Sequence, residues 1–297
     1  MARGLLVAVR PKQWLKNGLL FVPLVFTLNI GTFRLLVQSV EAVLIFCALS
    51  SAGYLLNDVA DVTADRQHPR KRFRPIAAGV VPVPLALGLG LVLASGGVVL
   101  AFLLRPQFGL LALLYLALTA SYTLWLKHIV LLDIFGLAGG FVLRAVAGAV
   151  AINVPASPWL YIATLLGALL IALGKRRAEL SALGAGAGEV RRNLEAYSLP
   201  LIDQLITVVS SAAVMTYALY TFSAENLPRD RSMMLTIPVV LYGMFRYLYL
   251  VHDGGGDAGD VSGAPEDLLF RDRPLLISVL LWVVLAVAVL YVGASAS

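Results

Sequence analysis

The stretch NDVADVTAD, residues 57–65, ends a long apolar run and carries three carboxylates, Asp58, Asp61 and Asp65. If the apolar helix continues through this stretch, the three- and four-residue spacing puts the three side chains on one face. Like charges in this arrangement repel each other unless a cation lies between them. Mg²⁺ prefers oxygen ligands, keeps several waters and is shared with substrate phosphates. The stretch therefore predicts a site for Mg²⁺ and a diphosphate.

Basic residues follow the acidic stretch at once. They are Arg66, Arg70, Lys71, Arg72 and Arg74. Arginine forks and a lysine point charge suit the remaining phosphate oxygens of such a ligand. The other interpretation is a solvated loop whose positive charges only fix the orientation of the chain in a membrane.

The composition indicates a polytopic membrane protein. Of 297 residues, 60% are hydrophobic and 13% charged, and the mean hydropathy is +0.87. The apolar runs are about twenty residues long and do not alternate with polar residues, so we expect helices and not barrel strands. We expect an all-α fold, a single domain over 1–297 with nine spans bundled around a polar cavity that faces the cytosol. The spans are expected at 18–30, 35–56, 83–104, 107–126, 129–151, 158–174, 201–222, 235–251 and 275–293.

The positive charges alternate between loops, which predicts the orientation. Seventeen of the 23 Lys and Arg residues fall in loops that this map assigns to one side, and four fall in the opposite loops. By the positive-inside rule, the amino terminus and the large polar loops face the cytosol of a plasma membrane. A secretory signal peptide is not expected, because no small-residue cleavage site follows the first apolar run. The basic pI of 9.5 then reflects orientation, and no nucleic-acid partner is expected.

Arg144 lies inside the fifth expected span, where a charged side chain costs roughly 2.5–3.5 kcal/mol. Gly136, Gly140 and Gly148 lie at four-residue steps from it and make one helix face small and close-packing. Two interpretations remain open. Arg144 pairs with a buried carboxylate as a structural lock, or it binds a substrate phosphate in a water-filled cavity.

Two further clusters of charge lie at expected span ends. Lys175, Arg176 and Arg177 follow the sixth span, with Glu179 beyond them. They are interpreted either as a helix-surface pair with orientation signals and anionic-lipid contacts, or as a phosphate clamp that faces the aspartates. The charged segment 265–274, before the last span, could cover a cytosolic cavity.

In combination, these motifs resemble the UbiA superfamily of intramembrane prenyltransferases over nearly the whole chain. Residues 57–65 match its N-D-x-x-D-x-x-x-D pattern. The segments 10–17, 72–79, 122–127 and 174–180 resemble more narrowly the decaprenyl-phosphate phosphoribosyltransferase branch. The acidic motif alone would identify only the superfamily.

One departure from the superfamily pattern is informative. Ordinary members carry a second aspartate-rich motif after the sixth span, where this chain has the basic cluster of residues 175–177. The resemblance implies 5-phosphoribosyl 1-diphosphate as donor and decaprenyl phosphate, or a similar polyprenyl phosphate, as acceptor. The product would serve synthesis of arabinan-type cell-wall precursors.

The resemblance and the charge pattern together assign roles to residues. Asp58 and Asp61, with Asn57, are expected to be catalytic. The expected Mg²⁺ ligands are Asp58, Asp61 and Asp65. The expected donor-binding residues are Arg66, Lys71, Arg72, Arg74 and Lys16. The expected acceptor-phosphate-binding residues are Lys127, Arg144, Lys175, Arg176 and Arg177.

Two rival functions remain. One is a conventional prenyltransferase that moves a prenyl diphosphate onto an aromatic acceptor, which the missing second acidic motif disfavours. The other is a transporter for an anionic solute, although the sequence shows no inverted halves or paired broken helices. Glycine-rich helix faces leave room for a homo-oligomer as well as for packing within one chain.

Overall fold

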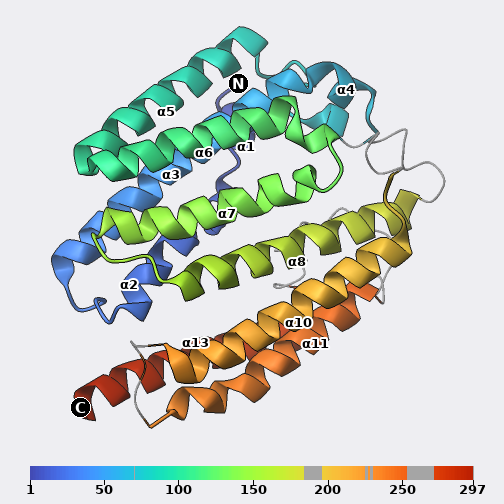
Figure 1. The fold of residues 1–297 in the computed structure, drawn as a ribbon. Coiled ribbons are helices and arrows are strands. Elements are labelled where there is room, and N and C mark those ends of the chain that lie inside the picture. The colour runs from blue at the N-terminus through green and yellow to red at the C-terminus, as the bar shows by residue number, and fades with distance from the viewer. Residues whose placement is uncertain (70, 184–195, 225–226, 228–229, 253–270, 297) are drawn as a thin grey trace. The chain divides into compact units, whose positions relative to one another are not determined.

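A computed structural model describes residues 1–69, 71–183, 196–224, 227, 230–252 and 271–296. The chain divides into two compact units, residues 1–156 and 157–297. All regular elements among the described residues are helices, and eight of them are long and apolar enough to cross a membrane (Figure 1). The predicted all-α, multi-pass fold is confirmed. The single domain predicted over 1–297 stays a prediction.

The first unit is built around one long helix, α3. Its elements are α1 (Ala2–Ala8), η1 (Pro11–Phe21), α2 (Val22–Phe26), α3 (Phe33–Ala60), α4 (Val62–Gln67), η2 (Lys71–Phe73), α5 (Val83–Leu104), α6 (Pro106–Leu124), η3 (Leu126–His128) and α7 (Leu132–Ala151). Helix α3 packs against η1, α5, α6 and α7, and α6 lies between α5 and α7 (Figure 1). Phe46 of α3 anchors the core, with its ring centroid 5.6 Å from that of Phe108 and 5.2 Å from that of Tyr115.

The first predicted span, 18–30, is not one continuous α-helix, so the described residues contain eight long apolar helices and not nine. The chain here forms a 3₁₀-helix, η1, followed by the short helix α2. Pro23 explains the division, because it has no N–H to donate to Leu19 and the hydrogen-bond pattern must restart. A 3₁₀-helix rises about 2.0 Å per residue against about 1.5 Å in an α-helix, so the sixteen residues together extend roughly 30 Å. This passage is therefore long enough to match the hydrocarbon layer.

This first passage runs antiparallel to α3. The backbone carbonyl of Val9 accepts a hydrogen bond from Ser51, 2.9 Å away. Eight residues further along, the amide of Asn17 donates to Cys47 and Ser50, each at 3.3 Å. Residue numbers rise along this passage while the residue numbers of its partners in α3 fall, so the two segments run in opposite directions.

In the first unit, the loops lie at alternate ends of the helices, as the distribution of Lys and Arg predicts. Gly4 packs beside Val80 and Val81, so the amino terminus and the loop after α3 share one end. At the other end Arg105 Nη1 donates to Asn153 Oδ1 at 2.7 Å, which joins the α5–α6 connection to the end of α7. The alternation of loops is therefore observed within this unit, and the side that faces the cytosol stays a prediction.

The second unit contains α8 (Pro158–Leu183), α10 (Leu199–Ser223), η6 (Ser232–Thr236), α11 (Ile237–His252) and α13 (Arg273–Ala296). Helix α10 packs against α8 and α11, and α11 packs against α13. Three polar side chains inside these apolar elements form hydrogen bonds with one another. Trp282 Nε1 donates to the Tyr217 hydroxyl at 2.7 Å, and that hydroxyl lies 2.5 Å from Thr236 Oγ1. Such hydrogen bonds remove the cost of placing polar groups in hydrocarbon.

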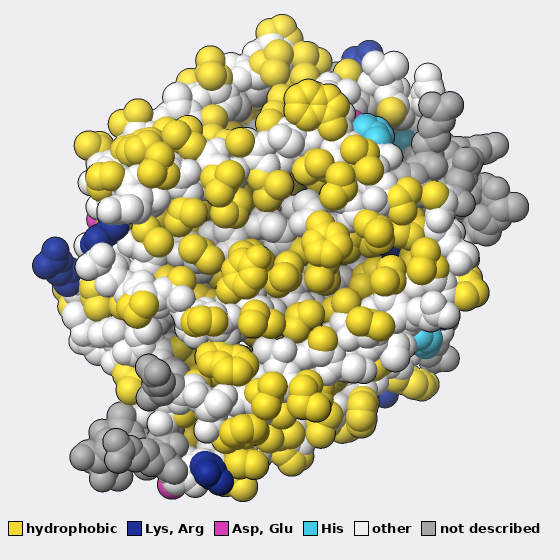
Figure 2. Space-filling model, viewed as in Figure 1, with side chains coloured by type: hydrophobic (Ala, Val, Ile, Leu, Met, Phe, Trp, Pro, Cys, Tyr) yellow, Lys and Arg dark blue, Asp and Glu magenta, His cyan; other side chains and the backbone are white. Residues whose placement is uncertain are grey.

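Large apolar side chains cover much of the surface. Figure 2 shows hydrophobic side chains over most of the visible face, with the few charged ones mainly near its edges. On α5, Leu91 and Leu103 are 70% and 77% exposed. In water such an apolar surface would drive association, whereas lipid is its natural solvent. The composition and surface together fit a bilayer environment.

Gly148 provides a test of the packing between α7 and η1. A Cβ at this position would lie 2.3 Å from the backbone oxygen of Leu20, which cannot move without shifting η1. We expect Gly148→Ala to destabilise the protein by roughly 1–3 kcal/mol through overpacking. Thermal unfolding in detergent, followed by a thiol-reactive dye on the buried Cys47, would measure the loss. Gly88→Ala is the matched control, since a Cβ there meets nothing within 4 Å; an equal melting temperature for both variants would contradict the packing argument.

Candidate functional site

The acidic stretch does not continue α3 as one helix. Helix α3 ends at Ala60, Asp61 forms the junction with φ −92° and ψ 4°, and α4 begins at Val62. The junction separates the three carboxylates by exposure. Asp58 and Asp65 are 2% and 3% exposed, whereas the side chain of Asp61 is 30% exposed. The expectation of one shared face therefore holds for Asp58 and Asp65, which meet at one cation, and not for Asp61.

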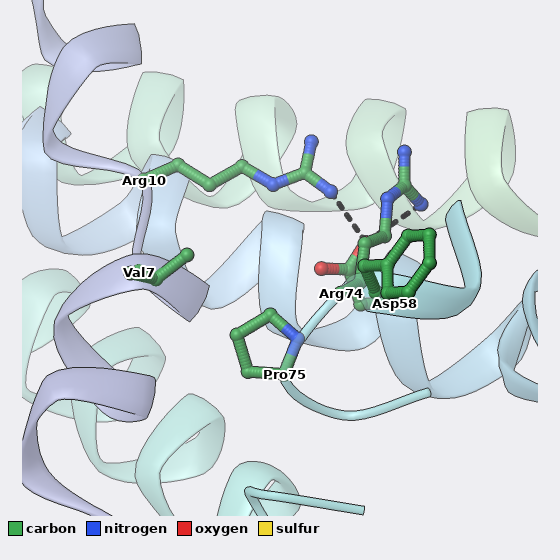
Figure 3. Close-up of a pocket in the computed structure, with 6 residues that line it drawn as sticks. Val7, Arg10, Asp58, Arg74 and Pro75 are labelled. Atoms are coloured by element: carbon green, nitrogen blue, oxygen red, sulfur yellow. Dashed lines mark hydrogen bonds and ion pairs between the residues drawn. The ribbon is translucent and has the colours of Figure 1, made fainter. Parts of the chain in front are cut away.

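Arg74 joins the two buried carboxylates. Its Nη1 lies 2.7 Å from Asp65 Oδ2 and 3.1 Å from Asp58 Oδ1. Arg10 also forms an ion pair with Asp58, with its Nη2 2.5 Å from the same Oδ1. In Figure 3 both guanidinium groups reach Asp58, Arg10 from the amino-terminal segment and Arg74 from the loop after α4. One carboxylate thus ties three segments of the chain together.

Sequence reasoning did not assign Arg10 to the site. The residue has a left-handed backbone (φ 52°, ψ 62°) between α1 and η1, and its guanidinium lies 5.0 Å from the centroid of the Tyr54 ring. Arg10 and Asp58 are 48 residues apart, so no helical spacing links them. The only signal available was that Arg10 begins the segment 10–17 that supports the family resemblance.

Asp61 and Asn57 face a different partner element. Lys127 of η3 is buried, and its Nζ lies 2.5 Å from Asp61 Oδ1. Thr123 of α6 donates to Asn57 Oδ1 at 3.5 Å, a long contact. Lys127 was predicted to bind the acceptor phosphate, and the structure places it against the acidic motif itself.

A cavity of about 380 Å³ opens beside the buried ion pairs. Its walls are formed by Val7, Arg10, Asp58, Phe73, Arg74 and Pro75 (Figure 3). The volume falls within the usual range of small-molecule sites. Two guanidinium groups and one carboxylate in an otherwise apolar lining are suited to an anionic ligand.

Of the five predicted donor-binding residues, the structure brings Arg74 to this cavity. Arg66 donates through Nε to the carbonyl of Ala77 at 3.2 Å, and Arg72 is exposed with its guanidinium 4.9 Å from the Phe73 ring. Lys71 donates through its backbone N–H to His68 Nδ1 at 3.3 Å. Lys16 lies elsewhere, 5.9 Å from the Phe141 ring on α7.

Arg144 has neutral partners. Its Nε, Nη1 and Nη2 donate to Asn17 Oδ1 at 2.8 Å, the Gly140 carbonyl at 2.8 Å and the Tyr115 hydroxyl at 2.6 Å. The guanidinium also lies 4.8 Å from the centroid of the Tyr115 ring. Both sequence interpretations assumed an anion, and none of these three acceptors is one. Acceptor binding by Arg144 stays a prediction.

In the second unit, Arg176 and Arg177 pair with side chains of the same unit. Arg176 is 0% exposed and pairs with Glu179. Arg177 donates to Asp203 Oδ1 at 2.7 Å and to the Val251 carbonyl at 2.8 Å, which joins α8 to α10 and α11. Lys175 is exposed. A clamp that faces the aspartates stays a prediction, because the aspartates belong to the other unit.

The charged segment 265–274 is described only from residue 271 onward, so its predicted role as a cover lies mostly outside the described residues. Asp272 accepts two hydrogen bonds from Arg246, at 2.7 and 3.1 Å, and one from the backbone of Leu275 at 2.8 Å. The hydrogen bond from Arg246 is the main reason that the pKa of Asp272 lies below its usual value. This pair fixes the start of α13 against α11.

The acidic motif supplies oxygen ligands, although the described residues contain no group of three His, Cys, Asp or Glu side chains arranged to hold a metal. Asp58 and Asp65 nevertheless converge on a single point, since one nitrogen of Arg74 contacts both. That nitrogen stands where a cation between the two carboxylates would lie. Because Mg²⁺ commonly takes one or two carboxylates and completes its shell with water and phosphate oxygens, the pair fits this metal.

A family model described as the UbiA prenyltransferase family matches residues 19–257. The chain belongs to this family. A decaprenyl-phosphate phosphoribosyltransferase from Corynebacterium glutamicum is 37% identical over 296 residues, which is 98% of this chain and 88% of that relative. A protein of the same name from Mycobacterium tuberculosis is 35% identical over 287 residues, covering 95% of this chain and 93% of that relative.

Solved structures share this UbiA fold. A UbiA homologue from Archaeoglobus fulgidus bound to DMAPP and Mg²⁺ has a TM-score of 0.72 at 17% identity, covering 97% of this chain and 99% of that chain. The same homologue bound to GPP and Mg²⁺ has a TM-score of 0.73 at 16% identity, with the same coverage. At this level of identity the likeness concerns the fold alone.

The pairing of Arg177 predicts that the basic cluster of this UbiA chain divides by role. We expect Arg177→Ala to lower the melting temperature by several degrees, because it removes the ion pair with Asp203 and the hydrogen bond to the Val251 carbonyl at the end of α11. Lys175→Ala is the matched control and should change the melting temperature little, because Lys175 is exposed. Circular dichroism of both variants in detergent would measure this. Equal melting temperatures would show that Arg177 is not a structural residue.

Proposed function

We propose that the protein transfers 5-phosphoribosyl from 5-phosphoribosyl 1-diphosphate to decaprenyl phosphate or a similar polyprenyl phosphate and releases diphosphate. The observation that carries this proposal is the identity of 35–37% to proteins named decaprenyl-phosphate phosphoribosyltransferase over 95–98% of the chain. A product of this kind would serve arabinan-type cell-wall precursor synthesis.

The charges of the site support an anionic donor. Within the acidic motif each carboxylate already contacts a cation of the chain, namely Arg10, Arg74 or Lys127. Arg66 of α4, with Lys71 and Arg72 of η2, follows the motif and adds positive charge. The diphosphate and 5-phosphate of the donor would accept hydrogen bonds from these arginine guanidinium groups and from the lysine ammonium group. In this proposal Arg10 and Arg74 bind the diphosphate, because they line the cavity.

Asp58 and Asp65, with Asp61 and Asn57 nearby on the motif, would hold Mg²⁺ on the donor. When bound, the metal would neutralise charge that develops on the leaving diphosphate. Before Asp58 and Asp65 can bind the metal, Arg10 and Arg74 must give up their ion pairs with these carboxylates and pair with phosphate oxygens of the donor. Their long, charged side chains can make that exchange without a change in the backbone.

The transfer itself needs no base from the chain. An oxygen of the acceptor phosphate would bond to ribose C1 while the bond from C1 to the diphosphate oxygen breaks, and the electron pair leaves with the diphosphate. A phosphate monoester is already ionised at neutral pH, so no proton has to be removed. For the acceptor phosphate we retain Lys175, Arg176, Arg177, Lys127 and Arg144, of which Lys175 is exposed.

The location of the enzyme is part of this proposal. The excess of Lys and Arg in alternate loops supports a plasma-membrane protein with its amino terminus and site toward the cytosol. Arg10, Asp58 and Arg74 then lie where a water-soluble sugar phosphate is available. The polyprenyl tail of the acceptor would remain in the bilayer beside the apolar helices.

A second candidate function is the conventional prenyltransferase reaction. It is favoured by the fold likeness to the Archaeoglobus fulgidus homologue bound to DMAPP or GPP with Mg²⁺. Against it stands the basic cluster of residues 175–177 where ordinary members carry a second acidic motif.

A direct assay tests the proposed reaction. Purified protein in detergent with lipid would receive Mg²⁺, labelled 5-phosphoribosyl 1-diphosphate and decaprenyl phosphate, and the lipid phase would be extracted. We expect label in that phase, lost with EDTA and reduced about 100-fold or more by Asp58→Asn. Glu41→Gln, which neutralises an exposed carboxylate on the same helix, should keep activity. Product from a prenyl diphosphate and an aromatic acid, without phosphoribosyl transfer, would favour the second candidate.

The role of Arg74 predicts metal binding without any turnover. Arg74→Gln removes the cation between Asp58 and Asp65, so the free protein should bind Mn²⁺ about tenfold more tightly, equivalent to roughly 1.4 kcal/mol. Titration followed by electron paramagnetic resonance of free Mn²⁺ measures this affinity. Arg72→Gln removes the same charge from an exposed neighbour and corrects for the general change in potential. If both variants bind Mn²⁺ equally well, Arg74 does not compete with the metal.

A further inference from the structure

We propose that Asn17 is a positioning residue that sets the register of η1 against α3 and so holds Arg10 at Asp58. This inference rests on the proposed function, in which Arg10 binds the donor. It concerns a side chain that lies outside the cavity.

The contacts of Asn17 extend to two other helices. The side chain is 0% exposed, and its Nδ2 donates to Ser50 Oγ and Cys47 Sγ of α3, each at 3.3 Å. Its Oδ1 accepts the hydrogen bond from Arg144 Nε of α7 at 2.8 Å. An amide has both donors and an acceptor, which is what this position requires.

Arg144 fixes the acceptor side of this contact. It also donates to the Tyr115 hydroxyl of α6 at 2.6 Å, and it is buried. Through Asn17 and Arg144, four elements, η1, α3, α6 and α7, meet in one buried polar network. A buried guanidinium is costly to leave without an acceptor, so the network resists displacement of Asn17.

The same side of η1 carries a second tie closer to Arg10. Trp14 Nε1 donates to Ser51 Oγ at 3.0 Å, and Ser51 Oγ in turn donates to the carbonyl of Val9 at 2.9 Å. Val9 directly precedes Arg10. Ser50 and Ser51 of α3 therefore accept hydrogen bonds from η1 at two points. These two points together determine the position of Arg10 at the start of η1.

The geometry of η1 makes its register important. A shift by one residue along a 3₁₀-helix moves the chain by about 2 Å and turns it by about 120°. Either change would take the guanidinium of Arg10 away from an oxygen that is now 2.5 Å distant. A shift would also bring Lys16 or Gly18 to the position of Asn17. Lys16 would put a second cation beside Arg144, and Gly18 would offer it no acceptor.

Apolar contacts alone would not choose this register, because apolar surfaces are non-directional and η1 packs among apolar side chains. A single buried polar residue is a well-attested way to fix register between helices. Asn17 fulfils that condition here.

A double-mutant cycle separates positioning from a general loss of stability. In the wild-type background we expect Asn17→Leu to raise the KM for 5-phosphoribosyl 1-diphosphate about tenfold. In the Arg10→Ala background the same substitution should raise it less than twofold, because Asn17 would have no Arg10 to position. Ser50→Ala, a milder change, should act in the same direction with the same dependence on Arg10. Ser39→Ala, which removes another buried hydroxyl of α3, is the matched control and should leave KM unchanged.

A distance measurement examines the register without chemistry. Spin labels at Lys12→Cys on η1 and Ala64→Cys on α4 use exposed positions, while the native Cys47 is buried. Double electron–electron resonance should give a shifted or broader distance distribution with Asn17→Leu and an unchanged one with Ser39→Ala.

In an active enzyme, an equal rise in KM in both backgrounds, or no rise, would overturn the inference. Absence of phosphoribosyl transfer by the wild-type protein would instead reject the proposed function. In that case the distance distribution alone decides the register role, and an unchanged distribution in Asn17→Leu and Ser50→Ala would overturn it.

Discussion

The ion pairs of Asp58 are the interaction on which the site depends. One buried carboxylate receives Arg10 from the amino terminus and Arg74 from the loop after α4, and Arg74 continues to Asp65. In a mostly apolar protein a buried charge must be compensated nearby. The ion pairs that compensate the charge of Asp58 therefore determine where the segments carrying Arg10 and Arg74 lie. These two segments form the walls of the cavity.

The charges of the site compensate one another. Asp58, Asp61 and Asp65 each contact a cation of the chain, so a metal ion alone would meet competition for them. In the proposed function, an anionic donor would change this balance, because its phosphates would bind the guanidinium groups and leave the carboxylates to a metal. On that proposal the anion and the cation would bind together, because the charges of a poorly solvated site interact strongly.

Buried cations elsewhere in the protein also connect helices. Arg144 is held by an amide, a hydroxyl and a carbonyl, and Arg177 is held by Asp203 and the end of α11. Both connect helices whose remaining contacts are mainly apolar. In a bilayer, where lipid tails are as apolar as the helix faces, hydrogen bonds between helices supply the specificity that apolar packing lacks.

The amino-acid sequence alone was enough to predict the eight long apolar helices, the alternation of charged loops, the acidic motif with its following basic run, and the family. These are local features, set by run length, composition and residue spacing. Three contacts became evident only in the folded chain: Arg10 with Asp58, Lys127 with Asp61, and Arg144 with Asn17. They span 48, 66 and 127 residues. Helical periodicity carries no information over such separations, because the partners are chosen by how the helices pack. The sequence also predicted one continuous span over 18–30, whereas the chain there forms η1 and α2, divided at Pro23. The contacts of Asn17 with α3 and α7 span 30 to 127 residues, so they too depend on how the helices pack.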